Sequence, residues 1–231
     1  MSEIDFSIER LSESAIVISF GKQIHPRILQ KVRSLSNYIE EHRFQGFIEL
    51  VPSFASVTIF FDPMKIKMTA VRVLLEETVK GLKLEHQVER REIVIPVCYG
   101  GELGPDLTLV AKHNHLTAEE VIEIHSNSSY LVYMIGFAPG FPYLGGLSER
   151  IHTPRKEVPR LGMPAGSVGI GGSQTGIYPI STPGGWQIIG KTPFELFRPH
   201  HQFPSLLQAG DTVRFQPISR ERYEEYKEER G

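Results

Sequence analysis

The sequence predicts an α+β fold, in which a small N-terminal α/β sandwich is followed by a β-barrel domain. Two stretches with helical periodicity alternate with short apolar runs in the first part of the chain, whereas short strands separated by Gly and Pro dominate from Tyr130 onward. Between these parts the composition turns charged at Val88–Arg91, which favours a domain boundary. We therefore expect one domain over residues 1–89 and a second over residues 90–231, because 231 residues suffice for two small cores.

The N-terminal part combines strand pairs with two amphipathic helices. Apolar residues recur every three or four positions from Ile28 to Ile39, which places them on one face of a helix. Two apolar runs separated by Pro52-Ser53-Phe54 suit a pair of antiparallel strands. This order predicts a sheet with both helices on one side. The expected elements are strands at Phe6–Ile8 and Ala15–Phe20, a helix carrying Ile28, Val32, Leu35 and Ile39, strands at Phe47–Val51 and Val57–Phe61, and a helix that carries Met64, Met68, Val71, Leu75 and Val79 and ends at Gly81.

The C-terminal part begins with a strand over Glu92–Tyr99 and a short helix over Asp106–Lys112. Thr117 and Glu120 have the spacing of a capping box, so a second helix should begin there. The brief apolar pieces that follow, with their glycine and proline turns, predict a closed or nearly closed barrel. The charged tail Arg220–Arg230 is either a helix or a frayed end, and we favour a solvated terminus.

Composition and charge exclude several classes of protein. The formal net charge is -2 and no basic stripe is present, so we expect no nucleic-acid partner. The apolar runs are too short to span a bilayer and the N-terminus lacks the segments of a signal peptide, so we expect a cytoplasmic protein with no membrane partner. The single cysteine, Cys98, has alternating apolar neighbours and is predicted to be a buried structural thiol in a reducing compartment.

The stretch from Ile135 to Pro193 is the predicted functional region. Its glycines and prolines specify shaped loops and short strands, because Gly reaches backbone conformations closed to other residues and Pro fixes φ. Cations, an amide and aromatic residues on such loops suit a small anionic or amide-bearing ligand. A simpler alternative is a β-barrel whose tight turns need the same glycines. The residues singled out are Arg155, Lys156, Arg160, Gln174, Tyr178, Trp186 and Lys191.

Common catalytic motifs are rejected on their sequence context. Gly185–Thr192 has the letters of a phosphate-binding P-loop, but its interior is bulky and strand-like and Pro193 stands where a helix should continue. The nine histidines include no grouping with the spacing or the cysteine partners of a zinc site, so we expect no metal site. The sequence has no Gly-x-Ser-x-Gly elbow, and its cysteine lacks the local pattern of a cysteine hydrolase.

A series of longer motifs stands out between positions 99 and 193. They are Tyr99–Gly101, Gly104–Leu107, Ile135–Gly146, Pro154-Arg155, Pro159-Arg160, Pro164–Ile170, Gln174–Pro179 and Pro183–Trp186. These motifs closely resemble the allophanate hydrolase subunit 1 family, and the resemblance covers essentially the whole chain. That family includes the B subunit of 5-oxoprolinase and KipI-like inhibitors of a sporulation histidine kinase. The chain departs from the family pattern at Met163, Gly171-Gly172 and Lys191, and a lysine cannot form the bidentate fork of the usual arginine.

The resemblance implies that the C-terminal domain is a cyclophilin-like β-barrel and that the chain is one component of an ATP-dependent 5-oxoprolinase. Such a chain works with a second barrel subunit of the allophanate hydrolase subunit 2 type and a third 5-oxoprolinase subunit. Together they open 5-oxo-L-proline to L-glutamate, with ATP as co-substrate. Opening a lactam requires activation of its carbonyl oxygen, and cations must neutralise the developing charge.

This chemistry assigns roles to residues of the functional region. The chain contains no convincing phosphate cradle or general base near that region, so we expect it to be inactive without its partner subunits. The candidates are Arg155, Arg160 and Lys191 as catalytic cations, Gln174, Tyr178 and Trp186 as substrate-binding residues, and Phe137, Phe141 and Tyr143 as exposed anchors for a partner subunit.

A regulatory binding module without chemistry is the alternative function. A groove lined by Phe137, Phe141, Tyr143 and Leu144 would hold a helical partner, such as the dimerisation domain of a sensor histidine kinase. Both functions occur in the same family, so the motifs do not separate them. A third interpretation, peptidyl-prolyl isomerase, rests on fold analogy alone.

Overall fold

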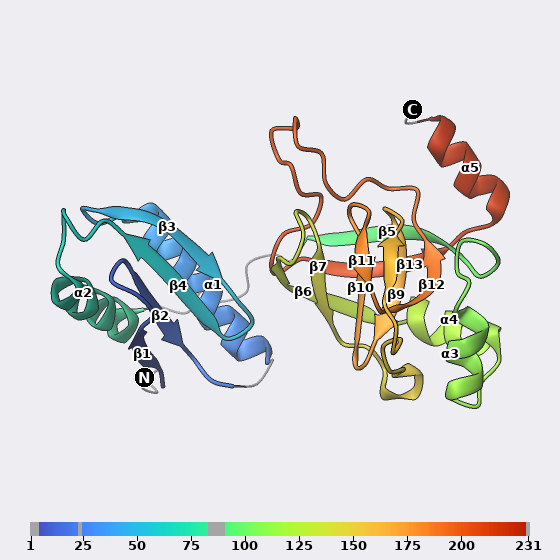
Figure 1. The fold of residues 1–231 in the computed structure, drawn as a ribbon, viewed down its shortest axis with the longest axis horizontal. Helices are drawn as coiled ribbons and strands as arrows, with labels where there is room; N and C mark the ends of the chain where they lie inside the picture. The colour runs from blue at the N-terminus through green and yellow to red at the C-terminus, as the bar shows by residue number, and fades with distance from the viewer. Residues whose placement is uncertain (1–4, 23–24, 83–90, 230–231) are drawn as a thin grey trace. The chain divides into compact units, whose positions relative to one another are not determined.

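A computed structural model describes residues 5–22, 25–82 and 91–229, and Figure 1 shows its ribbon. The chain divides into two compact units, Met1–Glu89 and Arg90–Gly231. The boundary predicted from the sequence falls between residues 89 and 90, which lie outside the described residues. Whether the second unit folds on its own stays a prediction.

The N-terminal unit is a four-stranded antiparallel sheet in the order β1-β2-β4-β3, with helices packed on one face (Figure 1). Ile16, Ile18, Val57 and Ile59 point from the two central strands toward the helices and are buried. This arrangement is the α/β sandwich that the sequence predicts. Its elements are β1 (Ser7–Arg10), β2 (Ala15–Ser19), α1 (Pro26–Glu41), β3 (Phe47–Pro52), β4 (Ser56–Phe61) and α2 (Met68–Gly81).

The two helices bury the apolar stripes that periodicity predicts, with one exception. Helix α2 begins at Met68, so the prediction that Met64 lies on its buried face is wrong, and Met64 is 91% exposed. The Asp62 carboxylate accepts a hydrogen bond from the Met64 N–H at 3.0 Å. The Lys65 and Ile66 N–H groups bond to the Asp62 carbonyl oxygen, so these residues form a separate turn ahead of the helix.

The C-terminal unit contains a closed barrel, which confirms the α+β class with a barrel domain. Its described strands close in the order β10-β7-β6-β13-β5-β12-β9, and β5 and β13 run parallel while the other pairs are antiparallel. A two-stranded ribbon of β8 and β11 is separate from the barrel. The strands are β5 (Glu92–Tyr99), β6 (Ser129–Ile135), β7 (Pro142–Gly145), β8 (Arg160–Met163), β9 (Ser167–Gly171), β10 (Gln174–Ile177), β11 (Thr182–Gly184), β12 (Gln187–Lys191) and β13 (Thr212–Pro217).

Two helices, α3 (Leu107–His113) and α4 (Ala118–Ser126), pack on the barrel and lie together beside β12 in Figure 1. The predicted capping box at the start of α4 is confirmed. The Thr117 hydroxyl accepts from the Glu120 N–H at 3.1 Å, and the Glu120 carboxylate accepts from the Thr117 N–H at 2.7 Å. A single turn of 3-10 helix, Glu149–Ile151, follows β7.

A polar network lies in the otherwise apolar interior of the barrel. His125 from α4 has its Nδ1 2.8 Å from the Tyr99 hydroxyl and its Nε2 2.9 Å from the Thr175 hydroxyl. The Thr175 hydroxyl donates to the Gly169 carbonyl at 3.0 Å, so it accepts from the imidazole Nε2–H and leaves Nδ1 to accept from Tyr99. Burial lowers the pKa of His125 to about 3, and the imidazole is therefore neutral.

The charged tail forms helix α5 (Arg220–Glu228), which packs on β5. The prediction of a solvated terminus is wrong for one face of this helix, because Tyr223 is only 3% exposed. Cys98 points outward from β5 on the side that α5 covers, and it is buried as predicted. Burial raises the pKa of its thiol.

Candidate functional site

The side chain of Trp186 lies across the outer face of barrel strands β9 and β10. A Cβ atom added at Gly171 would overlap the indole ring, and one added at Gly176 would stand 3.0 Å from it. Gly171 is therefore required for the ring to lie here, and a side chain at Gly176 would fit only if the ring moved slightly. The two glycines lie within strands rather than in the tight turns that the simpler barrel alternative invokes, and they make room for the aromatic residue that the functional interpretation singles out.

Trp186 belongs to a small apolar cluster outside the barrel core. Its ring meets Phe141 edge-on at 5.7 Å and Tyr178 at 6.2 Å between centroids. Burial raises the pKa of Tyr178, so its phenol stays protonated. Phe141 is only 2% exposed, and the expectation that it is an exposed anchor for a partner is wrong because its ring fills the cluster. The buried members of this aromatic cluster are Phe141, Met163, Tyr178, Trp186 and Ile188.

A segment over residues 154–160, which we call the strap, crosses the aromatic cluster. The Lys156 N–H donates to the Gly185 carbonyl at 2.7 Å, so the strap runs beside the start of β12. The Arg155 guanidinium carbon lies 5.8 Å from the centroid of the Trp186 ring, within the range of a cation–π contact. Arg155 is exposed, so this predicted cation remains accessible to a ligand.

Asp106, at the start of α3, binds the strap through its carboxylate. It accepts two hydrogen bonds from Arg160 at 2.8 Å each and lies 3.1 Å from the Lys156 ammonium. It also accepts from the Ile188 N–H at 2.7 Å. Burial raises the pKa of Asp106, but the bonds from Arg160, Ile188 and Lys156 outweigh it and hold the pKa below its usual value. The predicted cation Arg160 is therefore committed to an ion pair.

Sequence reasoning missed Asp106, although the residue lies within the motif Gly104–Leu107. The acidic residue in that motif was an available indication, because an aspartate that becomes buried needs a partner such as an arginine. Nothing in the local pattern identified Arg160 as that arginine, since 54 positions separate the two residues.

Lys191 lies at the far end of β12 from Trp186, roughly 16 Å away at the rise of an extended strand. It pairs with Cys98 on β5 and faces α5. Burial lowers the pKa of Lys191, and the nearby cations Lys227 and Arg220 act in the same direction. The three predicted catalytic cations therefore do not converge, and only Arg155 is both accessible and next to the aromatic cluster.

The accessible rim of the aromatic cluster contains three further predicted residues. Gln174 pairs with Gly171 across the β9–β10 hairpin, which places its side chain on the same face as the indole. Tyr143 is half-buried, and its ring lies 5.2 Å from that of Phe141. Phe137 is 67% exposed and has a φ of 68°, a conformation that is strained for an aromatic residue.

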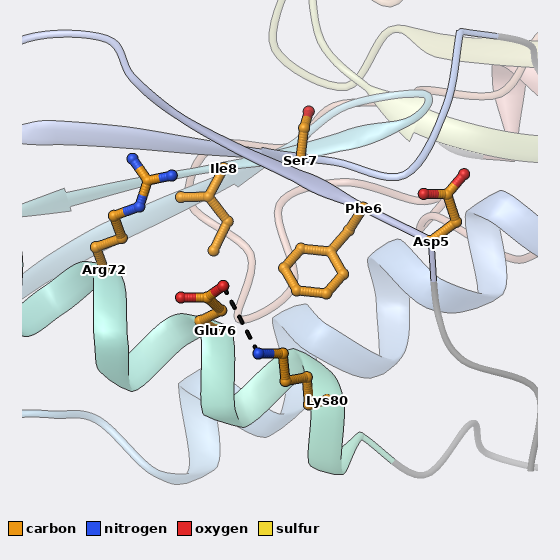
Figure 2. Close-up of a pocket in the computed structure, with 7 residues that line it drawn as sticks. All are labelled: Asp5, Phe6, Ser7, Ile8, Arg72, Glu76 and Lys80. Atoms are coloured by element: carbon orange, nitrogen blue, oxygen red, sulfur yellow. Dashed lines mark ion pairs between the residues drawn. The ribbon is translucent and has the colours of Figure 1, made fainter.

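A separate hollow of about 520 Å³ lies in the N-terminal unit, between the edge strand β1 and helix α2. Figure 2 shows the side chains of Phe6 and Ile8 directed toward α2, where Glu76 and Lys80 form an ion pair at 3.7 Å. Charges of both signs alternate along this face of the helix, and no predicted site residue lines the hollow. We therefore place the candidate site on the barrel. The hollow is lined by Asp5, Phe6, Ser7, Ile8, Arg72, Glu76 and Lys80.

The described residues contain neither a metal-binding cluster nor a helix that would cross a membrane. Over residues 5–22, 25–82 and 91–229, no three His, Cys, Asp or Glu side chains group as metal ligands do. None of the helices in the same ranges is both long and apolar enough to span a bilayer. The segment 185–192 is mostly strand β12, as the rejection of the P-loop motif predicts.

Comparison with known proteins identifies relatives that match nearly the whole chain. The chain is 52% identical over 236 residues to a protein from Bacillus subtilis (strain 168) that is named as the B subunit of 5-oxoprolinase, and the match covers 98% of each. The solved structure of the conserved uncharacterized protein PH0987 from Pyrococcus horikoshii is 45% identical, with a TM-score of 0.57 and coverage of 94% and 100%. The structure of TTHA0988 is 33% identical with a TM-score of 0.79, and the match covers 89% of this chain but only 40% of that one.

A family match covers most of the chain. Residues 6–207 match the carboxyltransferase domain, subdomain C and D, a region that includes the aromatic cluster, the strap and Asp106. The relationship to the B subunit of 5-oxoprolinase that the sequence motifs indicate is confirmed by the 52% identical relative. The chain therefore belongs to the family of carboxyltransferase domains, subdomain C and D, together with that 5-oxoprolinase subunit.

Proposed function

We propose that this chain is a component of an ATP-dependent 5-oxoprolinase that opens 5-oxo-L-proline to L-glutamate. The observation that carries the proposal is the 52% identity, over 98% of both chains, to a protein named as the B subunit of 5-oxoprolinase. That name describes one subunit of an enzyme, and we extend the need for partners to this chain. The proposed partners are a barrel subunit of the allophanate hydrolase subunit 2 type and a third 5-oxoprolinase subunit, with ATP as co-substrate of the complex.

The rim of the aromatic cluster suits the chemistry of this substrate, a small lactam that bears a carboxylate. Arg155 beside the indole offers a charge-assisted hydrogen bond to a carboxylate or to the carbonyl oxygen on which negative charge develops. The Gln174 amide both donates and accepts, as recognition of a lactam N–H and C=O requires. Arg160 is paired with Asp106 and Lys191 lies beside α5, so the proposal gives the role of the cation to Arg155.

The first test is dependence on partner subunits. We expect the purified chain alone to show no 5-oxoproline-dependent ATP hydrolysis, because the proposed site offers a cation and aromatic residues but no phosphate cradle. Activity should appear when the two partner subunits are added, as measured by phosphate release with and without 5-oxo-L-proline. Turnover by the single chain would contradict the partner requirement.

The second test is the Arg155→Gln variant in the assembled complex. Loss of one charge-assisted contact of about 1.4 kcal/mol should lower kcat/KM at least ~10-fold. Arg214→Gln is the matched control, because this exposed arginine pairs with Glu92 on the barrel and should leave kcat/KM unchanged. Equal activity of the two variants would remove Arg155 from the site.

The alternative function, inhibition of a sensor histidine kinase, predicts different results in the same preparation. The chain would then lower autophosphorylation of the kinase and would neither assemble with the two enzyme subunits nor support ATP hydrolysis. That pair of outcomes would replace the enzyme proposal with the regulatory one.

A further inference from the structure

We propose that Asp106 is a positioning residue that latches the strap over Trp186 and thereby holds Arg155 at the site. Two strap residues, Lys156 and Arg160, bind the same carboxylate, at 3.1 Å and 2.8 Å. Arg155 is the residue immediately before Lys156, so its guanidinium is placed over the indole by a segment whose two other cations are bound to Asp106.

The strap has weaker attachments besides this latch. The Gln187 amide donates to the Pro154 carbonyl at 2.9 Å, and the Lys156 N–H donates to the Gly185 carbonyl at 2.7 Å. Between its attached ends the strap exposes Glu157 and Val158 to solvent. At its other end the strap continues into β8, where Arg160 pairs with Gly184 of β11. Backbone contacts therefore hold both ends, and the latch adds the charged contact that binds them to the start of α3.

The latch depends on the negative charge of Asp106. Asp106 is 5% exposed, and its single negative charge lies between Lys156 and Arg160 and offsets their mutual repulsion. Without that negative charge, the two cations would be left close together and would repel each other. An uncharged residue at position 106 therefore removes the attraction and also favours separation of the strap from the barrel.

The chain provides its own reporter for this movement, because Trp186 is the only tryptophan among 231 residues. With the strap in place the indole is 5% exposed. Release of the strap would open the Arg155 side of the ring to solvent while the barrel core remains folded. The latch can thus be measured in the full-length chain without any ligand.

The test is quenching of Trp186 fluorescence by acrylamide in the folded wild type and in Asp106→Asn. Asparagine has the same shape and still accepts from the Ile188 N–H, but it lacks the charge that binds the strap. We expect the quenching constant to rise at least about twofold, because local opening exposes the ring. Asp211→Asn is the matched control, since Asp211 is a second buried carboxylate that binds an arginine, Arg91, and a backbone N–H. It should lower stability without changing the quenching of Trp186.

An unchanged quenching constant in folded Asp106→Asn would overturn the proposal. If that variant does not fold, Lys156→Gln removes one of the two latch cations and should give a smaller rise in quenching. The absence of any rise would then overturn the proposal as well.

The role of Arg155 rests on the proposed function, and a further measurement tests it in the assembled complex. There Asp106→Asn should raise KM for 5-oxo-L-proline more than it lowers kcat, because the cation is present but not held in place. A wild-type complex without activity would refute the proposed function and would leave the quenching result intact.

Discussion

Arg155 and Arg160 each follow a proline, yet the two side chains have different surroundings. Arg160 meets the buried carboxylate of Asp106 and forms two hydrogen bonds with it, whereas Arg155 lies over the Trp186 ring and is exposed. The difference comes from a residue 54 positions earlier in the chain. At the scale of single residues, a distant carboxylate thus decides which cation remains accessible to a ligand.

We expect Arg160→Ala to destabilise the fold. Removing the guanidinium leaves Asp106 buried with fewer partners, which should lower the free energy of unfolding by about 1–3 kcal/mol, since the pair is partly exposed. Urea denaturation followed by circular dichroism measures this change. Arg214→Ala, which breaks an exposed pair with Glu92, should cost less than about 1 kcal/mol. Equal midpoints for the two variants would contradict a structural role for Arg160.

His125 should make stability depend on pH. Its pKa is about 3 in the folded chain and 6.5 for an unperturbed imidazole. Between pH 3 and pH 6.5 the unfolded chain therefore binds one more proton at this residue than the folded chain does. The free energy of unfolding should therefore fall as the pH drops below 6.5, by up to about 1.4 kcal/mol per pH unit from this group. His125→Gln should be less stable than wild type near neutral pH, and the difference should shrink toward about pH 4. A difference that is constant with pH would contradict this role for His125.

Among the elements, the β9–β10 hairpin shows how glycine serves the site. Its glycines bring the backbone against the Trp186 ring, so the strands act as a flat support for an aromatic side chain. The β8–β11 ribbon contributes Met163 to the same cluster. The site therefore depends on close packing of strands rather than on a flexible glycine-rich loop.

The Gly171→Ala variant tests this support. The added methyl group would overlap the indole, so the ring must move, and we expect a loss of about 1–3 kcal/mol in the free energy of unfolding with a shift in Trp186 emission. Gly162→Ala is the matched control on β8, because its Cβ would meet only the Ser181 hydroxyl at an ordinary 3.6 Å. If Gly171→Ala matched wild type in stability and emission, the packing argument would fail.

Helix α5 is expected to protect the thiol of Cys98. Tyr223→Ala would remove the buried ring that joins the helix to the barrel and should cost about 3 kcal/mol. The rate at which a thiol reagent labels Cys98, the only cysteine, should rise in this variant and stay at the wild-type value in Tyr223→Phe. An unchanged labelling rate in Tyr223→Ala would show that α5 does not cover the thiol.

At the scale of the whole molecule, the two units have separate cores. The buried residues of the sandwich and those of the barrel form different clusters with no member in common. A fragment of residues 90–231 should therefore fold alone as a mainly β domain, because it keeps its complete core. Circular dichroism and amide dispersion in nuclear magnetic resonance measure this outcome. An insoluble or helical fragment would show that the barrel needs the first unit.

Most of the secondary structure was predictable because its causes are local. Periodic apolar residues fixed the buried faces of α1 and α2, and the Thr117–Glu120 pair marked the start of α4. The alternation of short apolar runs with Gly and Pro indicated a barrel, since many short strands separated by tight turns are typical of that architecture. The limits of local reasoning show at Met64, where the same apolar spacing continues into a turn that Asp62 holds outside the helix.

The sequence by itself determined the family, the two kinds of architecture and the set of residues from which a site is built. Only the tertiary structure decided which members of that set act together. It buried Phe141, tied Arg160 to Asp106 and placed Lys191 beside α5, away from Arg155. The physical reason is that the pattern of buried residues in a helix or strand repeats over a few positions and can be read locally. Ion pairs and aromatic contacts instead join segments that are distant in sequence and meet only when the barrel closes.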